Sequence, residues 1–585
     1  MLRILKKMNV LLDAKQKRAM IALIIMMLIG GVLESLGVSM LVPIVTVVMD
    51  PEAVQDSELL SSVYELLGMH SNAEFAMFLL LAFVGMTVIK NVYLFFQQKV
   101  QLRFVYTNQF ATSRRMMINF MQRPYEYYLN ADTSVIQRNI TSDVNNMYGL
   151  ILSCLQLFSE CIVFVCLVVA LFIYSDAMMI VTVAALMVIL LLVIKKILKP
   201  IMIKAGQDNQ DYYSGLYKWI EQSVMGIKEI KIGCKENYFI NGYAECGAGY
   251  VNSVQKYNLF NATPRLLIET VCIAGMVGYF VLSIGQGTQV KDLVPQLSAL
   301  AAAAAMRLLP SVNRINNYQT SISYFEPFFM GVSDNLQEEI HDGKVTYDAE
   351  VYRQKQSVEK LPLQKEIRLE NITYKYPNTE KWIFDHADMQ IPIGSSVGIV
   401  GTTGAGKTTI VDILLGLLQM ESGRILADDV DVSGHYEGWL KNIGYIPQTI
   451  FMLDDSIRRN VAFGVPEEEI DEKKVWRALE EAALDDFVRS LPEGIETGIG
   501  ERGIRISGGQ RQRISIARAL YEDPEVLVLD EATSALDNET EAAIMDSINR
   551  LHGRKTLVII AHRLQTIEKC DMVYRVDAGK ISRER

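Results

Sequence analysis

Ser396-Val-Gly-Ile-Val400 and the stretch that follows it, Gly401-Thr-Thr-Gly-Ala-Gly-Lys-Thr408, decide the fold of the C-terminal part of this chain. A short apolar run, a glycine-rich loop and the helical run 410–418 stand in the strand, loop and helix order that a phosphate-binding loop requires. The glycines let the backbone wrap around phosphates, Lys407 reaches the β and γ oxygens, and Thr408 can ligate Mg²⁺. The sequence therefore predicts a site for ATP and Mg²⁺.

An acidic strand end supplies the second part of this site. The apolar run Val526-Leu-Val-Leu-Asp530 ends in an aspartate that can orient the Mg²⁺ shell, and Glu531 follows it directly. Glu531 is thereby placed to polarise the attacking water. We therefore expect hydrolysis of ATP and not binding alone.

Further motifs resemble those of the ABC ATPase family. They are Ser507-Gly-Gly-Gln510 after Ile506, Gln448 after a proline, Ser534-Ala-Leu-Asp537, His562 after an apolar strand, and Tyr376 in Lys-Tyr-Pro. Their order resembles the signature, the glutamine loop, the D-loop, the catalytic histidine and the adenine-stacking aromatic of that family, with isoleucine in place of leucine before the signature serine. Each motif alone is weak evidence, whereas the ordered set is diagnostic.

The resemblance assigns a role to each motif position. The residues expected to bind ATP are Tyr376, Gly401, Thr402, Thr403, Gly404, Ala405, Gly406, Lys407, Thr408, Thr409, Ser507, Gly508, Gly509, Gln510 and Asp537. The residues expected to act in catalysis are Glu531, His562 and Gln448, and those expected to hold Mg²⁺ are Thr408, Gln448 and Asp530.

The resemblance also implies a homodimer. In ABC proteins ATP lies between the phosphate-binding loop of one subunit and the signature of the other, and this chain has one of each. Two chains are then needed for any complete site. The segment 500–503, Gly-Glu-Arg-Gly, resembles the X-loop of exporters and favours an exporter over an importer ATPase.

The N-terminal part is apolar enough to lie in a bilayer. Hydrophobic residues make up 50% of the 585, and a net charge of −10 argues against a nucleic-acid partner. Candidate spans of about 20 residues or more lie at 19–48, 75–98, 147–174, 177–200, 258–285 and 292–326. We therefore expect a six-span α-helical transmembrane domain of the type IV exporter class at 1–335, a linker at 336–362, and an α/β nucleotide-binding domain at 363–585.

Loop charges predict the orientation of these spans. Lysine and arginine gather between the second and third spans and between the fourth and fifth, which places both termini in the cytoplasm. The two basic loops are long, so we expect the helices to continue as stalks that turn near 124–132 and near 219–228. The outward segment 55–68 has an apolar helical face, so it is either an amphipathic helix on the membrane surface or an ordinary loop helix.

Four cations lie within the predicted spans: Lys90, Arg265, Arg307 and Arg314. A central cation costs about 2.5–3.5 kcal/mol on insertion scales, so we expect these side chains to face water, acids or an anionic ligand. The alternative is structural pairing, because Arg265 and Glu269 are spaced i,i+4 and Lys90 can snorkel to an interface. An anion path through a polar cavity is the reading that we favour.

The whole chain resembles a narrower family, the bacterial lipid-linked oligosaccharide flippases of the PglK type. The resemblance is carried by Thr263-Pro-Arg265, Arg307-Leu-Leu-Pro-Ser-Val-Asn-Arg314, Tyr445-Ile-Pro-Gln448 and Ala532-Thr-Ser-Ala-Leu-Asp537. It implies that Arg265, Arg307 and Arg314 hold a pyrophosphate. Lys90 departs from a family arginine. The segment 55–68 stands where the family has an external helix for the polyprenyl tail, although its sequence matches poorly.

The resemblance implies ATP-driven flipping of a polyprenyl-pyrophosphate-linked oligosaccharide across a bacterial inner membrane, in support of protein glycosylation. An exporter of lipid A, phospholipid or hydrophobic drugs is the alternative of the same architecture. A drug pump is expected to have an aromatic cavity without four basic residues. An ATP-gated channel is a further alternative, which the intact Glu531 and His562 argue against, because gating requires binding more than turnover.

Overall fold

A computed structural model describes residues 2–40, 44, 64, 71–174, 177–285, 309–342, 357–377, 379–530, 544–546, 548–560 and 567–585. These residues form two compact units. The first comprises Met1–Arg123 and Ala131–Tyr347, and the second comprises Pro124–Asn130 and Asp348–Arg585. Apart from Tyr64, the segment 55–68 lies outside the described residues.

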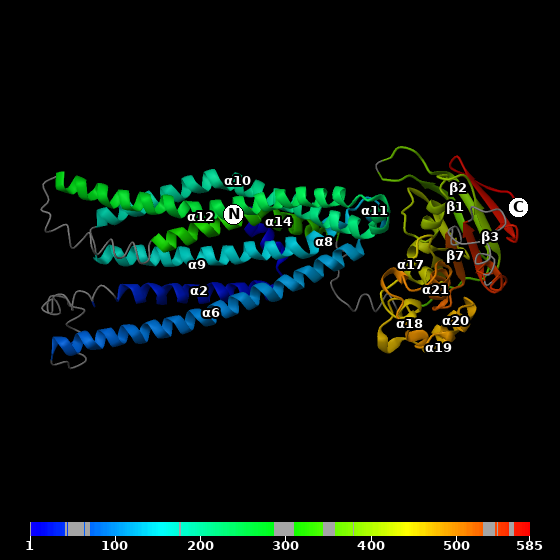
Figure 1. Ribbon diagram of the computed structural model, residues 1–585, viewed down its shortest axis with the longest axis horizontal. Helices are drawn as coiled ribbons and strands as arrows, with labels where there is room; N and C mark the ends of the chain where they lie inside the picture. The colour runs from blue at the N-terminus through cyan, green and yellow to red at the C-terminus, as the bar shows by residue number, and fades with distance from the viewer. Residues whose placement is uncertain are drawn as a thin grey trace. The chain divides into compact units, whose positions relative to one another are not determined.

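The first unit is entirely helical in its described part. Its elements are α1 (Leu2–Leu11), α2 (Ala14–Ser39), α6 (Asn72–Gln122), α8 (Thr133–Arg138), the π-helix η1 (Asn139–Asp143), α9 (Val144–Tyr174), α10 (Ala177–Met225), α11 (Ile227–Gly233), α12 (Glu236–Gly285) and α14 (Leu309–Asp342). Figure 1 shows α9, α10, α12 and α14 side by side, with α2 next to α6. The helical transmembrane domain predicted from the sequence is therefore confirmed.

Several helices are much longer than a bilayer is thick. Helices α6, α10 and α12 contain 51, 49 and 50 residues. At 1.5 Å per residue each is about 75 Å long, against a hydrocarbon core of about 30 Å. Within the described residues three segments are long and apolar enough to cross a membrane: Ala14–Glu34, Ala73–Gln122 and Thr133–Cys166. Each overlaps one of the first three expected spans, 19–48, 75–98 and 147–174.

The first stalk turn lies where the sequence places it, and the second lies further along the chain. Helix α7 (Tyr125–Tyr128) occupies the first turn and belongs to the second unit, where the Gln419 N–H donates to Glu126 Oε1 at 2.9 Å. The second turn, expected at 219–228, is α11 and its flanking residues. Trp219 lies inside α10, because its ring packs against Tyr238 and Phe239 of α12 with centroids 5.7 and 5.8 Å away.

Helix α14 carries the end of the expected sixth span. It runs without a break from Leu309 through Pro327 to Asp342, so the chain remains helical beyond residue 335. The rest of that span, 292–308, lies outside the described residues. At the start of the second unit Leu361 is already buried, and its N–H donates to the Gly438 carbonyl at 3.1 Å.

In its described residues the second unit contains two sheets. The larger has the strand order β10 (Lys580–Arg583), β9 (Met572–Asp577), β3 (Ser396–Val400), β8 (Thr556–Ile560), β7 (Val526–Asp530) and β6 (Ile443–Ile446), and all pairs except β10–β9 are parallel. Strands β3, β7 and β8 are buried at every residue. Continuous apolar runs are typical of parallel strands that are covered on both faces.

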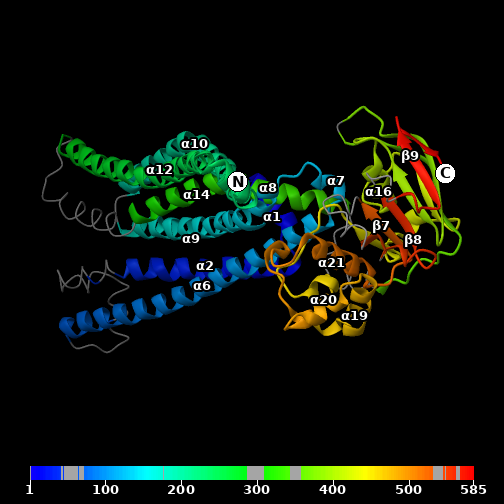
Figure 2. The ribbon, with the colours of Figure 1, turned by 45° about the vertical axis from the view of Figure 1, so that its right-hand side comes forward.

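The smaller sheet is antiparallel, in the order β2 (Phe384–Pro392), β1 (Glu366–Tyr374), β4 (Ser422–Ala427) and β5 (Val430–Asp431). The helices of the unit are α16 (Lys407–Leu414), η3 (Val432–Gly434), α17 (Tyr436–Leu440), α18 (Ile457–Val461), η4 (Glu467–Glu469), α19 (Glu472–Glu481), α20 (Asp485–Ser490), η5 (Gly494–Glu496), η6 (Glu501–Gly503) and α21 (Gly508–Leu520). Figure 2 shows α19, α20 and α21 gathered together within this unit. The predicted α/β domain is confirmed.

Candidate nucleotide and membrane sites

The glycine-rich loop connects the centre of the larger sheet to α16. Strand β3 ends at Val400, and α16 begins at Lys407 after the loop. Gly406 has φ +105°, which side-chain-bearing residues rarely adopt, and a Cβ there would lie 2.9 Å from Ile383 Cγ2. A Cβ on Gly401 would lie 2.5 Å from the Val576 carbonyl oxygen. Glycine is therefore required at both ends of this loop.

The lysine of the loop is held by the loop itself. Lys407 is 6% exposed, and its Nζ donates to the carbonyl oxygens of Gly401 and Thr402 at 3.1 and 3.2 Å. A buried ammonium needs such partners, since leaving it unpaired is costly. A triphosphate that enters the loop offers stronger, charge-assisted bonds to the same ammonium. Lys407 is thereby already positioned for phosphate.

Oxygen ligands for a divalent cation lie beside the loop. Thr408 Oγ1 and Asp530 Oδ1 are 3.5 Å apart, and Asp530 ends the buried strand β7. Asp412, one turn after Thr408 on α16, has its pKa raised to about 6 by burial and by the neighbouring Asp530. No group of three or more His, Cys, Asp or Glu residues suited to a metal occurs in the described part of the chain. One carboxylate and one hydroxyl fit Mg²⁺, which completes its shell with water and phosphate oxygens.

Tyr376 lies next to the loop, as the sequence requires of an adenine-stacking residue. Its hydroxyl is 2.9 Å from Thr409 Oγ1, and its ring packs edge-on against Tyr374 with centroids 5.3 Å apart. These two contacts restrain the ring near the start of α16. The restraint reduces the conformational entropy that the side chain loses when a base stacks on it.

We expect Tyr376→Ala to weaken ATP binding about tenfold or more, because stacking of a base on an aromatic ring is worth about 1–3 kcal/mol. Tyr376→Phe keeps the ring and loses only the Thr409 contact, so its Kd should rise by less than about threefold. Titration of the purified full-length protein with a fluorescent ATP analogue measures both. An equal loss in the two variants would assign the effect to the hydroxyl and would contradict stacking.

The signature serine starts helix α21. Ser507 Oγ accepts the Gln510 N–H at 3.2 Å, and Gln510 Oε1 accepts the Ser507 N–H at 2.8 Å, which is a capping box. Ser507 and Gly508 are exposed to solvent. Helix α21 packs on α18, α19 and β6, and among the described residues no hydrogen bond joins 507–510 to 401–409. The signature and the glycine-rich loop of one chain are thus separate surfaces.

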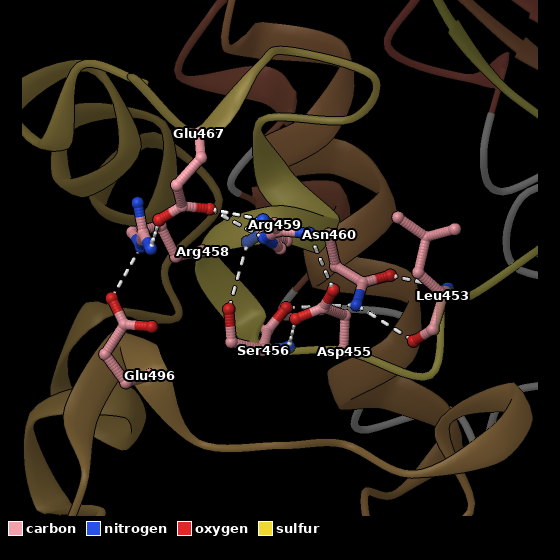
Figure 3. A network of polar contacts seen from close by, with 8 residues as sticks. All are labelled: Leu453, Asp455, Ser456, Arg458, Arg459, Asn460, Glu467 and Glu496. Carbon is pink, nitrogen blue, oxygen red and sulfur yellow. Dashed lines mark hydrogen bonds and ion pairs between the residues drawn. The ribbon is translucent and has the colours of Figure 1, made fainter. Parts of the chain in front are cut away.

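The segment after Gln448 is tied firmly to α21. Figure 3 shows Asn460 bonded to Leu453 and Ser456, and Glu467 lying between Arg458 and Arg459. Arg518 of α21 donates from Nε to the Asn460 carbonyl at 2.8 Å and from Nη1 to the Phe451 carbonyl at 2.7 Å. Burial lowers the pKa of Arg518 to about 10, so it stays charged at neutral pH. Hydrogen bonds therefore join the segment 451–460, shortly after Gln448, to the signature helix.

Four expected site residues lie outside the described part of the chain: Glu531, Asp537, His562 and Arg307. Glu531 directly follows β7, and His562 follows β8 by two residues in the sequence. Strands β7 and β8 are parallel neighbours, with Asp530 opposite Ile560. The C-terminal ends of β7 and β8 therefore lie at the same edge of the sheet. Nucleotide sites of such sheets are found at this edge.

Within the helical unit an acid accompanies Arg314. Arg314 Nη1 lies 3.2 Å from Glu160 Oε1, and Ser311 Oγ donates to the same oxygen at 3.0 Å. The Glu160 side chain is 8% exposed, whereas that of Arg314 is 42% exposed. Ser311 and Arg314 come from α14 and Glu160 from α9, which pack together. One side of the guanidinium is therefore paired, and the other remains accessible.

Arg265 lies at the same depth as Arg314. Ile268 of α12 packs with Val312 of α14, and the side-chain amide nitrogen of Asn317 donates to the Asn261 carbonyl. Arg265 lies between the two contact residues of α12, and Arg314 lies between the two contact residues of α14. No ion pair joins Arg265 to Glu269 among the described residues, and both are exposed. The i,i+4 pairing that the sequence left open for Arg265 is therefore not observed.

Lys90 is separate from these arginines. A Cβ on Gly37 of α2 would lie 3.6 Å from Lys90 Cδ, whereas Gly31 approaches Ile162 of α9, two residues after Glu160. Lys90 is therefore displaced by roughly 10 Å along the helices from the Glu160–Arg314 pair. Of the four expected substrate residues, the structure brings Arg265 and Arg314 to one level and does not bring Lys90 to them.

Comparison with known proteins agrees with both units. Residues 384–534 match the ABC transporter family, and residues 20–288 match the family described as ABC transporter transmembrane region. The chain belongs to the ABC transporter family. In this ABC transporter an ATPase domain is thus joined to a multi-pass membrane domain, and hydrolysis of ATP is coupled to transport.

Two curated relatives and one solved structure resemble this ABC transporter over long stretches. The ATP-dependent lipid A-core flippase of Bordetella avium (strain 197N) is 28% identical over 514 residues, covering 86% of this chain and 83% of the relative. The flippase of the same description from Saccharophagus degradans is 32% identical over 363 residues, covering 62% and 58%. A bacterial Atm1-family ABC exporter with ATP bound aligns with a TM-score of 0.74 at 23% identity, covering 97% and 96%. That structure supports the exporter fold.

Sequence reasoning missed the acid of the membrane site in this ABC transporter. Glu160 stands alone among apolar residues of the predicted span 147–174, which is the same anomaly that drew attention to the cations. A search for acids as well as bases within the spans finds it. Pairing with Glu160 offsets part of the cost of placing Arg314 in the membrane.

Proposed function

We propose that this ABC transporter flips a polyprenyl-pyrophosphate-linked oligosaccharide from the cytoplasmic to the outer leaflet of a bacterial inner membrane. The observation that carries the proposal is the half-exposed guanidinium of Arg314, held by Glu160 at the depth of Arg265. A pyrophosphate between membrane helices requires cations with free N–H groups, and guanidinium forks provide charge-assisted bonds to it. The lipid tail can remain in the bilayer.

We propose that two identical chains form the working unit. The exposed start of α21 and the glycine-rich loop share no hydrogen bond within the described part of one chain, so each is free to complete the site of a second copy. Ser507, Gly508, Gly509 and Gln510 of one chain then face the phosphates held by Lys407 of the other. Two ATP molecules are bound in such a dimer.

Each residue of the ATP site has a proposed role in hydrolysis. Lys407 binds the β and γ oxygens, and Gln448 and Glu531 orient and polarise the attacking water. The water gives its proton to Glu531 as its oxygen bonds to the γ-phosphorus, the bond from that phosphorus to the β–γ bridging oxygen breaks, and ADP is the leaving group. His562, which follows β8 by two residues in the sequence, stabilises the transferring phosphoryl group. Mg²⁺, held by Thr408 and Asp530, would supply neutralisation of the developing negative charge. The bonds from Arg518 to the segment after Gln448 transmit the change to α21.

A lipid A-type cargo is the second candidate, and the names of the relatives favour it. Lipid A also carries phosphates, so the arginines suit either cargo. The two candidates differ in the group attached to the phosphate and in the apolar tail. They therefore call for a direct comparison of cargoes.

The test is a flipping assay in proteoliposomes that contain the full-length protein and one labelled cargo at a time. We expect ATP-dependent movement of a polyprenyl-pyrophosphate-oligosaccharide, and stimulation of ATPase activity by it but not by the matching polyprenol, which lacks phosphate. Movement of lipid A-core alone would replace the proposed cargo with the second candidate. Stimulation by hydrophobic drugs alone, or ion currents without lipid movement, would refute both.

A further inference from the structure

Tyr445 lies on the face of the larger sheet from which Asp530 projects. Tyr445 of β6 is aligned with Val528 of β7, and aligned residues of neighbouring strands place their side chains on the same face. Side chains alternate along a strand, so Asp530, two residues after Val528, projects from that face as well. Tyr445 packs against the apolar cluster that contains Val528 and Ile410 of α16. The phenol is therefore close to both the strand that ends in Asp530 and the helix that follows the glycine-rich loop.

The opposite face of the sheet agrees with this placement. Ile446, Leu527 and Leu529 belong to a different apolar cluster, which also contains Ile514 and Leu520 of α21. Consecutive residues of β6 and β7 thus alternate between the two clusters, as the register of these strands requires.

The hydroxyl of Tyr445 reaches the carboxylate of Asp530. Burial raises the pKa of Tyr445, the charges of Asp530 and Asp412 raise it further, and so does a hydrogen bond between Tyr445 and Asp530. The phenol is therefore protonated at neutral pH, and its O–H donates to the carboxylate. A carboxylate accepts about four hydrogen bonds or metal contacts, so a bond from Tyr445 leaves room for a cation on the same group.

A neutral donor suits the surroundings of Asp530. Asp530 is 3% exposed, and its Oδ1 lies 3.5 Å from Thr408 Oγ1, at the outer limit of a hydrogen bond. Asp412 of α16 adds a second negative charge nearby, and burial together with the charge of Asp530 raises the pKa of Asp412 to about 6. Repulsion between like charges drives such carboxylates apart. The phenol of Tyr445 stabilises one position of the Asp530 side chain without adding a charge.

We propose that Tyr445 is a positioning residue for the metal site, whose hydroxyl holds the Asp530 carboxylate in the orientation in which Asp530 and Thr408 bind Mg²⁺ together. Carboxylates that ligate metals are themselves hydrogen-bonded, and loss of the bonding partner costs about 10–100-fold in metal affinity. Tyr445 acts through Asp530, so its hydroxyl affects binding of the metal and not of the nucleotide alone. The inference rests on the metal role proposed for Asp530, and it does not depend on which cargo is transported.

The test is a titration of the purified full-length protein with Mn²⁺, which substitutes for Mg²⁺ and whose free concentration is read by electron paramagnetic resonance. A non-hydrolysable ATP analogue is supplied below the concentration of sites, so that nearly all of it is bound to protein. We expect Tyr445→Phe to raise the Kd for Mn²⁺ about tenfold or more. Its Kd for the nucleotide in EDTA should equal that of the wild type, since the ring and its packing remain.

Two further variants make the result specific. The matched control is Tyr574→Phe in β9 of the same sheet, which removes a hydroxyl that donates to the Gln390 carbonyl at 2.9 Å. It should bind Mn²⁺ as the wild type does. Asp530→Asn removes the charge of the proposed ligand and should weaken binding of Mn²⁺ at least as much as Tyr445→Phe does.

The outcomes separate the inference from the role on which it rests. Wild-type Mn²⁺ affinity in Tyr445→Phe, beside a loss in Asp530→Asn, would overturn the positioning role and leave the metal role of Asp530 intact. Wild-type affinity in Asp530→Asn would refute that metal role and the inference with it. Weaker nucleotide binding by Tyr445→Phe in EDTA, or an equal loss of Mn²⁺ affinity in Tyr574→Phe, would assign the effect to packing and would also overturn the proposal.

Discussion

Lys407→Ala should reduce the ATPase rate of the reconstituted transporter by on the order of 100-fold or more. The ammonium is buried in the glycine-rich loop and donates to the carbonyl oxygens of Gly401 and Thr402, from which it can transfer to phosphate. Alanine removes the positive charge closest to the transferring group and leaves two carbonyl oxygens facing the triphosphate. Release of inorganic phosphate at saturating ATP measures the loss.

The matched control is Lys580→Ala, an exposed lysine of strand β10 in the same unit. It should hydrolyse ATP as the wild type does, because surface charges far from the loop are screened. Flipping of the labelled lipid should fall in parallel with hydrolysis in Lys407→Ala. Retention of more than about a tenth of the ATPase rate by Lys407→Ala would contradict the role proposed for this lysine.

Arg314→Ala should destabilise the membrane unit more than Glu160→Gln does. Removal of the arginine leaves Glu160, which is 8% exposed, as an unpaired buried carboxylate, at a cost of about 3 kcal/mol or more. Removal of the acid's charge leaves Arg314, which is 42% exposed and can reach water, so the cost should be about 1 kcal/mol or less. Glutamine at 160 also preserves an acceptor for Ser311. Thermal unfolding in detergent measures this asymmetry.

The double variant Glu160→Gln/Arg314→Ala separates pairing from transport. It removes both charges, so its stability should return to near that of the wild type. Its flipping activity should remain at least about tenfold below that of the wild type, since the guanidinium for the pyrophosphate is gone. Wild-type flipping by the double variant would show that Arg314 serves only to pair with Glu160. Equal destabilisation by the two single variants would contradict the different burial of the partners.

The nucleotide site was predictable because its motifs are local. The strand 396–400, the loop and α16 are consecutive in the sequence, and only glycine suits the backbone of Gly406. The capping box formed by Ser507 and Gln510 is equally local, since its residues are three apart. Neighbours along the chain are enough to specify such features, whatever the rest of the fold does.

Features that join distant segments were not predictable in the same way. The second stalk turn was expected at 219–228, but Trp219 is held inside α10 by aromatic residues of α12. The pairing of Arg314 with Glu160 joins residues that are 154 apart in the sequence. The i,i+4 spacing suggested a pair of Arg265 with Glu269 instead, and that pair is not observed. In both places packing between helices overrode the local pattern.

The sequence by itself determined the two-part architecture, the ATP-binding loop with its acidic strand end, and the presence of cations in apolar spans. These features follow from composition, periodicity and short-range geometry, which do not depend on contacts with distant segments of the chain. Only the tertiary structure decided which cation has a counter-charge, which arginines share a depth, and which hydroxyl reaches Asp530. Those properties depend on which helices and strands are neighbours, and the burial of many side chains together selects the neighbours.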